Sequence, residues 1–330
     1  MSAAPSLRTM RITLALAFTW TAFALVFFLR GTLFHPGWTT PVSTSNTPGR
    51  IGVTWVAPAA EAAGVQPGDE LVSIDGVPYL RWGRDGLWRN LVPGKANLYR
   101  FVDRDGHATD VALEPCPISD QPFPLVPVYL ASFVVASAFF AMGVLVWLLR
   151  RGRVEAWAFG LFSAFVAVQL YTAFDTYRQT AGYERSAINF FLLAAAVFHL
   201  FTTYPFEPRW LTARRWLRGA LYGVALAAAP IIWLEGRFGV PFFAIAQVGF
   251  AFLIVVTIFC LGAVALERRR RRAEEDVARA DVMLLAAFGS FVPVLGLIVA
   301  ESFLRTGFPV YLALLWFIVF PVSVAYGIVK

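Results

Sequence analysis

Long apolar runs, separated by short polar segments, make up most of this chain. About eight of these runs are long enough to cross a bilayer as helices, because a spanning helix needs roughly 20 mainly apolar residues. We place these runs at Ile12–Leu29, Val126–Leu149, Ala156–Phe174, Ala187–Tyr204, Gly219–Leu234, Pro241–Leu266, Val282–Phe303 and Val310–Val329. The pattern therefore predicts a polytopic α-helical membrane protein.

One polar region interrupts this pattern between the first and second predicted spans. Residues 31–124 are rich in Gly and Pro and carry both acidic and basic side chains. Residues 51–79 read as strands around a short helix, and residues 96–115 alternate around the Asp105-Gly106 turn of a β-hairpin. We expect an anchor helix over residues 1–30, an inserted small α+β domain over 31–124 and a bundle of about seven helices over 125–330.

Composition and charge support this organisation. Hydrophobic residues make up 58% of the chain and charged residues 15%, against roughly 45–50% and about 25% in soluble domains. The formal charge of +7 does not indicate nucleic-acid binding, because most basic residues lie in short runs beside the apolar segments. Such runs are retained on the cytoplasmic side.

The positions of Arg and Lys therefore predict the orientation. The segments predicted to be cytoplasmic contain Arg8 and Arg11, Arg150, Arg151 and Arg153, Arg209, Arg214, Arg215 and Arg218, Arg268–Arg272 with Arg279, and Lys330. The short outer loops contain Arg178, Arg185, Arg237 and Arg305. We expect a multi-pass protein of the inner (plasma) membrane with cytoplasmic termini and an extracytoplasmic polar domain. The first span resembles a signal peptide, but Phe27–Arg30 offers no small-residue cleavage site, which favours an uncleaved anchor.

The stretch PAAEAAGVQPGD from Pro58 to Asp69, followed by Ile74-Asp75-Gly76, resembles the signature of bacterial PDZ domains. This resemblance implies a domain that binds a peptide or protein C-terminus as an added strand beside a groove helix near residues 81–91. The implied peptide-binding residues are Ile51, Gly52, Val53, Trp55, Leu87, Trp88 and Leu91. The alternative is a PDZ-like module for packing or dimerisation above the membrane.

A few polar residues fall within the predicted spans, where they are costly and often functional. These intramembrane candidates are His199, Gln169, Gln247 and Glu301. His199 is either a neutral imidazole that hydrogen-bonds a neighbouring helix or a proton relay or ligand contact. Gln169 and Gln247 either join helices or line a cavity, and Glu301 is placed to pair with Arg305 at i,i+4.

We recognise no catalytic motif in the sequence. His35, His107 and His199 are widely separated and lack the paired-histidine motif of a zinc protease. Cys116 and Cys260 have no metal-ligand spacing, and residues 288–291 do not match the nucleophile motif of a rhomboid protease. We expect no catalytic residue, metal site or cofactor in this chain.

Two further stretches resemble the membrane part of competence-type quorum-sensing histidine kinases. They are HLFTTYPFEPR from His199 to Arg209 and FPVSVAYGIVK from Phe320 to Lys330. The resemblance implies a bacterial two-component sensor that passes a signal through its last helix to an output domain beyond Lys330. The alternatives are a membrane scaffold that recruits an envelope protein and, less favoured, a transporter. Lipid and a peptide or protein C-terminus are the expected partners, and a homodimer stays open.

Overall fold

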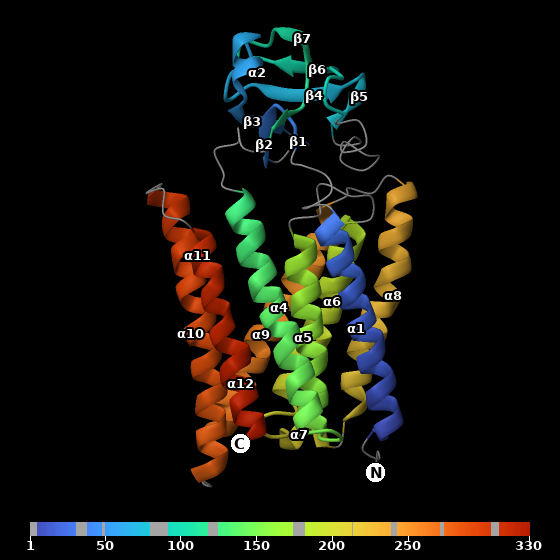
Figure 1. The fold of residues 1–330 in the computed structure, drawn as a ribbon, viewed down its shortest axis with the longest axis vertical. Coiled ribbons are helices and arrows are strands. Elements are labelled where there is room, and N and C mark those ends of the chain that lie inside the picture. Colours follow the sequence, from blue (N-terminus) through green and yellow to red (C-terminus); the bar gives the residue numbers. More distant parts are fainter. Residues whose placement is uncertain are drawn as a thin grey trace. The chain divides into compact units, whose positions relative to one another are not determined.

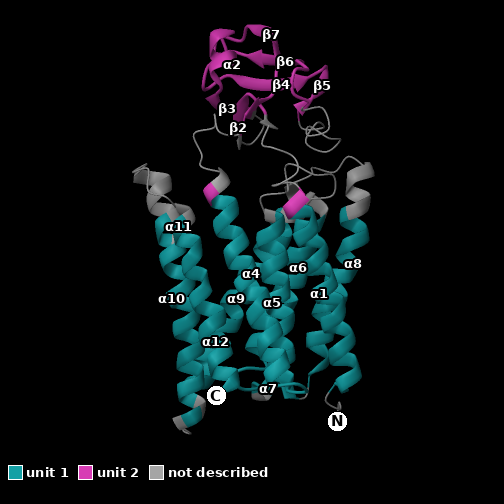
Figure 2. Ribbon diagram, in the orientation of Figure 1, with its two compact units in different colours: residues 1–28, 128–176, 181–330 teal, residues 29–127, 177–180 magenta. Residues whose placement is uncertain are grey.

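The computed structural model describes residues 5–30, 38–47, 50–79, 92–117, 125–173, 182–212, 214–238, 243–270, 274–304 and 310–330. The chain divides into two compact units (Figure 2). Unit 1 comprises Met1–Phe28, Val128–Thr176 and Ala181–Lys330, and unit 2 comprises Leu29–Pro127 and Tyr177–Thr180. Unit 1 is helical, and unit 2 is built on a small antiparallel sheet (Figure 1).

Most of the chain is helical. The long helices are α1 (Leu7–Leu29), α4 (Leu125–Leu149), α5 (Val154–Ala173), α6 (Gly182–Phe201), α8 (Trp216–Phe238), α9 (Phe243–Arg270) and α10 (Glu274–Leu304). Shorter helical elements are α7 (Arg209–Thr212), α11 (Val310–Leu315), the 3-10 turn η4 (Trp316–Ile318) and α12 (Val319–Val329). Six helical stretches of the described chain are long and apolar enough to cross a membrane, whereas Arg185–Phe201 and Trp216–Ile232 are shorter apolar helices.

Helix α6 lies inside the bundle and packs against α5, α8 and α9. The side chains of Ala194, Ala195 and Ala196 are fully buried along this helix. Small side chains let membrane helices approach closely, and this close approach replaces the hydrophobic driving force that is lost in lipid. The predicted span at Ala187–Tyr204 thus overlaps α6, although the helix begins and ends earlier in the chain.

The last predicted span is not one regular helix. The chain forms α11, then η4, then α12 where the pattern predicts a continuous helix over Val310–Val329. Pro321 explains the change, because proline has no N–H to donate to the carbonyl of Phe317, and the preceding turn tightens to a 3-10 geometry. Helices α8 and α10 continue through Pro230 and Pro293.

Unit 2 contains eight strands and one short helix among its described residues. They are β1 (Trp38–Thr39), β2 (Val42–Thr47), β3 (Arg50–Val56), α2 (Pro58–Ala62), β4 (Glu70–Ile74), β5 (Val77–Pro78), β6 (Asn97–Val102), β7 (Ala108–Leu113) and β8 (Cys116–Pro117). The main sheet has the order β2-β3-β4-β6-β7, with β5 paired to β4, and β1 pairs separately with β8. All these pairings are antiparallel.

The PAAEAAG stretch forms a short helix with well-defined ends. Pro58 occupies the first turn of α2, where its missing N–H costs no hydrogen bond. Gly64 has φ +92°, its N–H donates to the carbonyl of Glu61, and the N–H of Val65 donates to Ala60. This pair of bonds is a Schellman motif, which requires the left-handed conformation that glycine adopts without strain.

The core of unit 2 forms on one face of the sheet. Along β6, Tyr99 and Phe101 are buried while Leu98 and Arg100 point outward, as the two-residue period of a strand requires. These rings pack with further buried apolar residues: Val42, Ile51, Val53, Ala60, Val65, Leu71, Ile74 and Leu113. The apolar alternation seen in the sequence therefore supplies a separate core for this unit.

Candidate functional site

The strand that the PDZ resemblance assigns to peptide binding lies inside the sheet. Ile51, Gly52, Val53 and Trp55 belong to β3, which pairs with β2 along its length and with β4 at Gly52. The backbone of Val53 also exchanges hydrogen bonds with the segment before β4, at 2.7 and 2.8 Å. β3 thus has a neighbour on each side at Gly52 and Val53, and the assignment of the four residues to peptide binding stays a prediction.

Strand β2 is the edge strand on this side of the described sheet, with β3 as its hydrogen-bonded neighbour there. Val42 points into the core, and the hydroxyl of Thr44 lies 3.1 Å from that of Tyr79. Leu87, Trp88 and Leu91, the residues assigned to the groove helix, lie outside the described residues. Among the described strands the sheet ends at β2 on one side and at β7 on the other, and these are the edges beside which a strand could be added.

The glycine and aspartate residues of the signature hold turns together. The Asp69 carboxylate accepts a hydrogen bond from the backbone N–H of Gln66 at 2.8 Å. Asp75 and Gly76 both have positive φ in the two-residue turn between β4 and β5, as a type I′ hairpin requires. The Asp75 carboxylate accepts bonds from the N–H of Leu98 and the side chain of Asn97.

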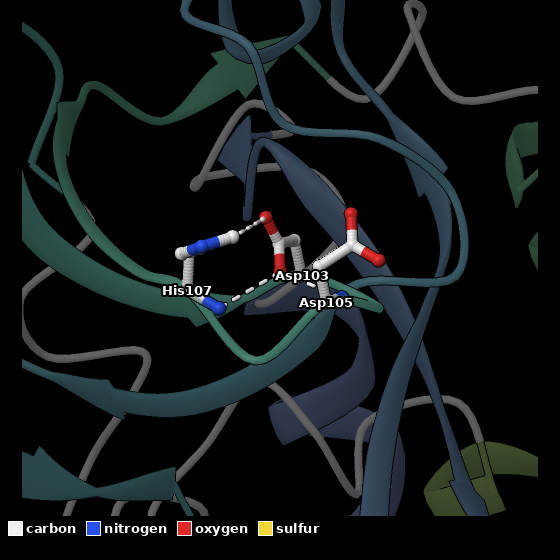
Figure 3. Close-up of side chains that lie close together, drawn as sticks. All are labelled: Asp103, Asp105 and His107. Atoms are coloured by element: carbon white, nitrogen blue, oxygen red, sulfur yellow. Dashed lines mark hydrogen bonds and ion pairs between the residues drawn. The ribbon is translucent and has the colours of Figure 1, made fainter.

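Asp103, Asp105 and His107 gather at the β6–β7 turn, with one potential ligand atom from each within 4.8 Å of the others. Figure 3 shows the Asp103 carboxylate facing His107. Its Oδ1 accepts the backbone N–H groups of Asp105 and His107, both at 2.9 Å, and Oδ2 lies 3.3 Å from His107 Nδ1. The His107 amide in particular lowers the pKa of Asp103. All three side chains are exposed. The hydrogen bonds of Asp103 stabilise the turn, and this role accounts for the cluster.

Within unit 1, His199 forms the most connected of the predicted polar sites. It is 2% exposed, and its Nδ1 lies 3.4 Å from the hydroxyl of Tyr222 on α8. The Trp157 ring of α5 contacts the imidazole edge to face at 4.5 Å. Trp157 Nε1 donates to Thr13 Oγ1 of α1 at 2.9 Å. Three helices, α5, α6 and α8, thus meet at His199, and Trp157 connects α1 to them.

Gln169 joins α5 to α6 rather than lining the His199 region. Its Nε2 donates to Ser186 Oγ at 3.0 Å, and its Oε1 accepts from Asn189 Nδ2 at 2.9 Å. Asn189 also donates to the Phe165 carbonyl. Gln247 is exposed on α9, and the side chain of Glu301 lies outside the described residues, as does Arg305. Among the described side chains, His199, Gln169 and Gln247 therefore do not form one site.

A charged cluster that the sequence analysis did not single out lies between α6 and α8. Glu207 accepts two hydrogen bonds from Arg215, at 3.0 and 2.7 Å, and pairs with Arg218 at 3.2 Å. Arg218 also donates to the hydroxyl and the carbonyl oxygen of Thr202. The side chains of Arg218 and Glu207 are only 14% and 23% exposed. The mixed charges of residues 207–218 were a signal for such pairing.

A cavity of about 830 Å³ adjoins both His199 and this charged cluster. Its walls come from α1, α5, α6, α8 and the segment after α6: Pro5, Thr9, Thr13, Leu16, Ala17, Trp20, Val154, Glu155, Trp157, Leu161, Phe165, Leu192, His199, Thr203, Pro205, Phe206, Glu207, Arg215, Arg218, Gly219, Tyr222 and Leu226. The volume lies within the range of roughly 300–1,000 Å³ of small-molecule sites.

Comparison with known proteins gives no relative. Neither family models, curated proteins nor solved structures match this chain.

Proposed function

We propose that this chain is the membrane-embedded sensor module of a bacterial signal-transduction protein. In this proposal about eight helices cross the inner membrane, both termini are cytoplasmic, and unit 2 is an extracytoplasmic PDZ-like domain that binds a peptide or protein C-terminus. The ordered turns at Gly64, Asp69 and Asp75 support the PDZ-like assignment. The Arg-rich loops of one side support the orientation.

The observation that carries the proposal is the position of Phe320 on α12. This buried ring contacts Phe139 of α4, Phe162 of α5, Phe201 of α6 and Phe291 of α10, with centroid distances of 6.5, 5.4, 6.4 and 5.8 Å. A rearrangement of any of these helices must therefore repack the last helix, because membrane-protein interiors are close-packed. Near the end of the same helix, Arg150 donates to the Val329 carbonyl.

The proposed mechanism needs a ligand that prefers one packing of the bundle over another. A ligand shifts such an equilibrium only by its difference in affinity for the two arrangements. The effector would be a domain beyond Lys330 or a separate cytoplasmic protein, and we assign no catalytic step to the residues of this chain.

The test uses the full chain in nanodiscs with a library of peptides that carry free C-termini, with amidated peptides as the control. We expect a subset to bind only with a free carboxylate and to change the hydrogen-exchange protection of residues 319–329. Binding without any change in α12 would instead support the scaffold alternative. If no peptide of the library binds, peptide capture by unit 2 is wrong.

A further inference from the structure

We propose that the cavity of unit 1 is a binding site for a single-chain lipid whose polar head is uncharged. The site lies in the helical unit and does not depend on peptide capture by unit 2. Three features of the cavity carry this inference: its elongated shape, the separation of its apolar and polar walls, and the balance of charge at its polar end.

The cavity is elongated along the helices. Its lining on α1 extends from Thr9 to Trp20, which corresponds to about 16 Å at the rise of an α-helix. The N-terminal end of α1 and helix α7 lie at the same end of unit 1 (Figure 1). The cavity thus runs parallel to the helices, in the direction that a hydrocarbon chain takes in a bilayer.

The two ends of the cavity differ in chemistry. The inner part is lined by apolar side chains and by the indole of Trp20. The apolar residues are Leu16, Ala17, Leu161, Phe165, Leu192 and Leu226. The charged side chains gather at the end near α7, where the lining comprises Thr9, Glu155, Thr203, Glu207, Arg215 and Arg218 beside Pro5, Val154, Pro205 and Phe206. His199 and Tyr222 lie between the two parts. This division fits an amphiphile with its hydrocarbon chain inside and its head at the polar end.

The charges at the polar end favour an uncharged head. Glu155 and Glu207 offset Arg215 and Arg218 in formal charge. Glu207 binds both arginines, and Arg218 also donates to the hydroxyl and carbonyl oxygens of Thr202. An anionic head would have to compete with Glu207, and a cationic head would have to compete with the arginines. A charged head would leave the formal charge of this end unbalanced while being partly desolvated, which is unfavourable.

The selectivity of the cavity among lipids should depend on the polar head and not on the hydrocarbon chain. The hydrocarbon chain of the ligand leaves lipid rather than water when it enters the cavity, so its transfer provides packing but little hydrophobic gain. Lipids with the same chain and different heads should therefore differ strongly in affinity. Hydroxyl and ester groups of an uncharged head can use the threonine and charged side chains of the polar end as hydrogen-bond partners.

Gly219 and Gly223 provide a matched pair of variants. Gly219 lines the cavity and Gly223 does not, both lie on α8, and a Cβ at either position meets no atom within 4 Å. A Phe side chain at position 219 would extend from the cavity wall, whereas position 223, one turn further along α8, lies outside the lining. The variant Gly219→Phe therefore tests occupation of the cavity, and Gly223→Phe controls for the added aromatic ring.

The experiment places the full chain in nanodiscs of ether-linked phospholipid and adds three probes with the same acyl chain: a monoacylglycerol, the fatty acid and the fatty amine. Native mass spectrometry counts the bound molecules. We expect one monoacylglycerol per protein, bound at least about tenfold more tightly than either charged probe. Gly219→Phe abolishes this binding and Gly223→Phe retains it. Glu207→Gln moves the preference toward the fatty acid, because both arginines lose their partner.

Three results would overturn the proposal. Equal binding of all three probes would show that the head is not recognised. Equal loss of binding in Gly219→Phe and Gly223→Phe would place the lipid elsewhere. Retention of a two-chain phospholipid in the cavity, displaced by none of the probes, would make a bilayer lipid the occupant rather than a single-chain one.

Discussion

The indole of Trp157 and the imidazole of His199 meet edge to face, with ring centroids 4.5 Å apart and planes inclined by 82°. This geometry directs the positive edge of one ring toward the negative face of the other. The contact joins α5 to α6, while the hydroxyl of Tyr222 approaches the same imidazole from α8. His199 therefore fills space and connects helices, whether or not it contacts a ligand.

We expect His199→Ala to destabilise the protein by about 2–4 kcal/mol, because it removes a buried ring and the partner of the Tyr222 hydroxyl. Thermal melting of the purified chain in detergent measures the change. Tyr222→Phe serves as the comparison and should cost only about 0.5–1 kcal/mol, since its hydrogen bond of 3.4 Å is long. A larger effect of Tyr222→Phe than of His199→Ala would contradict this assignment of the contact energies.

Close packing between α4 and α5 gives a second prediction. A Cβ at Gly143 would lie 2.7 Å from the Cβ of Ser163, whereas a Cβ at Gly262 of α9 meets no atom within 4 Å. Gly143→Ala should therefore lower the melting temperature, by an overpacking cost of about 1–3 kcal/mol. Gly262→Ala should leave it unchanged or raise it slightly, because alanine favours the helix. Equal melting of the two variants would show that α4 and α5 can move apart without cost.

The apolar runs predicted the helices because spanning a membrane constrains length and composition so strongly. The sequence could not predict the break before Pro321, since a proline in a span produces either a continuous helix, as at Pro230, or a tightened turn. The mostly helical chain and its inserted sheet were foreseeable, and the described residues contain six apolar helices of membrane-spanning length.

The site residues were harder to predict, because they depend on contacts between distant segments. The sequence predicts a strand around Ile51–Val53 but does not predict its neighbours, and the pairing with β2 and β4 places it inside the sheet. Glu207 and Arg218 read as loop charges and topology signals, although they form a partly buried pair. The cavity is lined by side chains from four helices that are far apart in the sequence. A local sequence pattern therefore cannot predict it.

The turn between β6 and β7 gives a pH prediction. Hydrogen bonds hold the pKa of Asp103 below its ordinary value of 3.8, and Arg100 does the same for Asp110. A carboxyl group with a lowered pKa stabilises the fold above pH 3.8 and loses this contribution as the pH falls through its folded-state pKa. Hydrogen exchange of residues 97–113, corrected for intrinsic rates, should therefore show lower protection at about pH 3 than at pH 7.

The variant Asp103→Asn tests the origin of this acid sensitivity. It should lower the protection of the hairpin already at neutral pH and reduce the further loss on acidification, because the carboxylate that accepts two backbone amides is gone. The control is Asp105→Asn, whose side chain accepts neither of these two bonds. A wild-type pH response in Asp103→Asn would assign the acid sensitivity to the pair of Arg100 and Asp110.

The last prediction concerns the coupling of α12 to the rest of unit 1. Phe320→Ala removes a fully buried ring from a cluster that includes four other helices. We expect a loss of about 3–5 kcal/mol of stability, together with faster hydrogen exchange of residues 319–329. The matched control is Val322→Ala on the same helix, where the side chain is 48% exposed and little packing is lost.

The comparison of the two variants separates local from transmitted effects. If α12 is held by the aromatic cluster, Phe320→Ala also loosens the contact of Arg150 with the Val329 carbonyl, because both act on the same helix. Exchange at residues 327–329 would then increase in Phe320→Ala and stay at the wild-type level in Val322→Ala. Unchanged exchange in both variants would show that the end of α12 is held independently of Phe320, and the proposed route from the bundle to the last helix would fail.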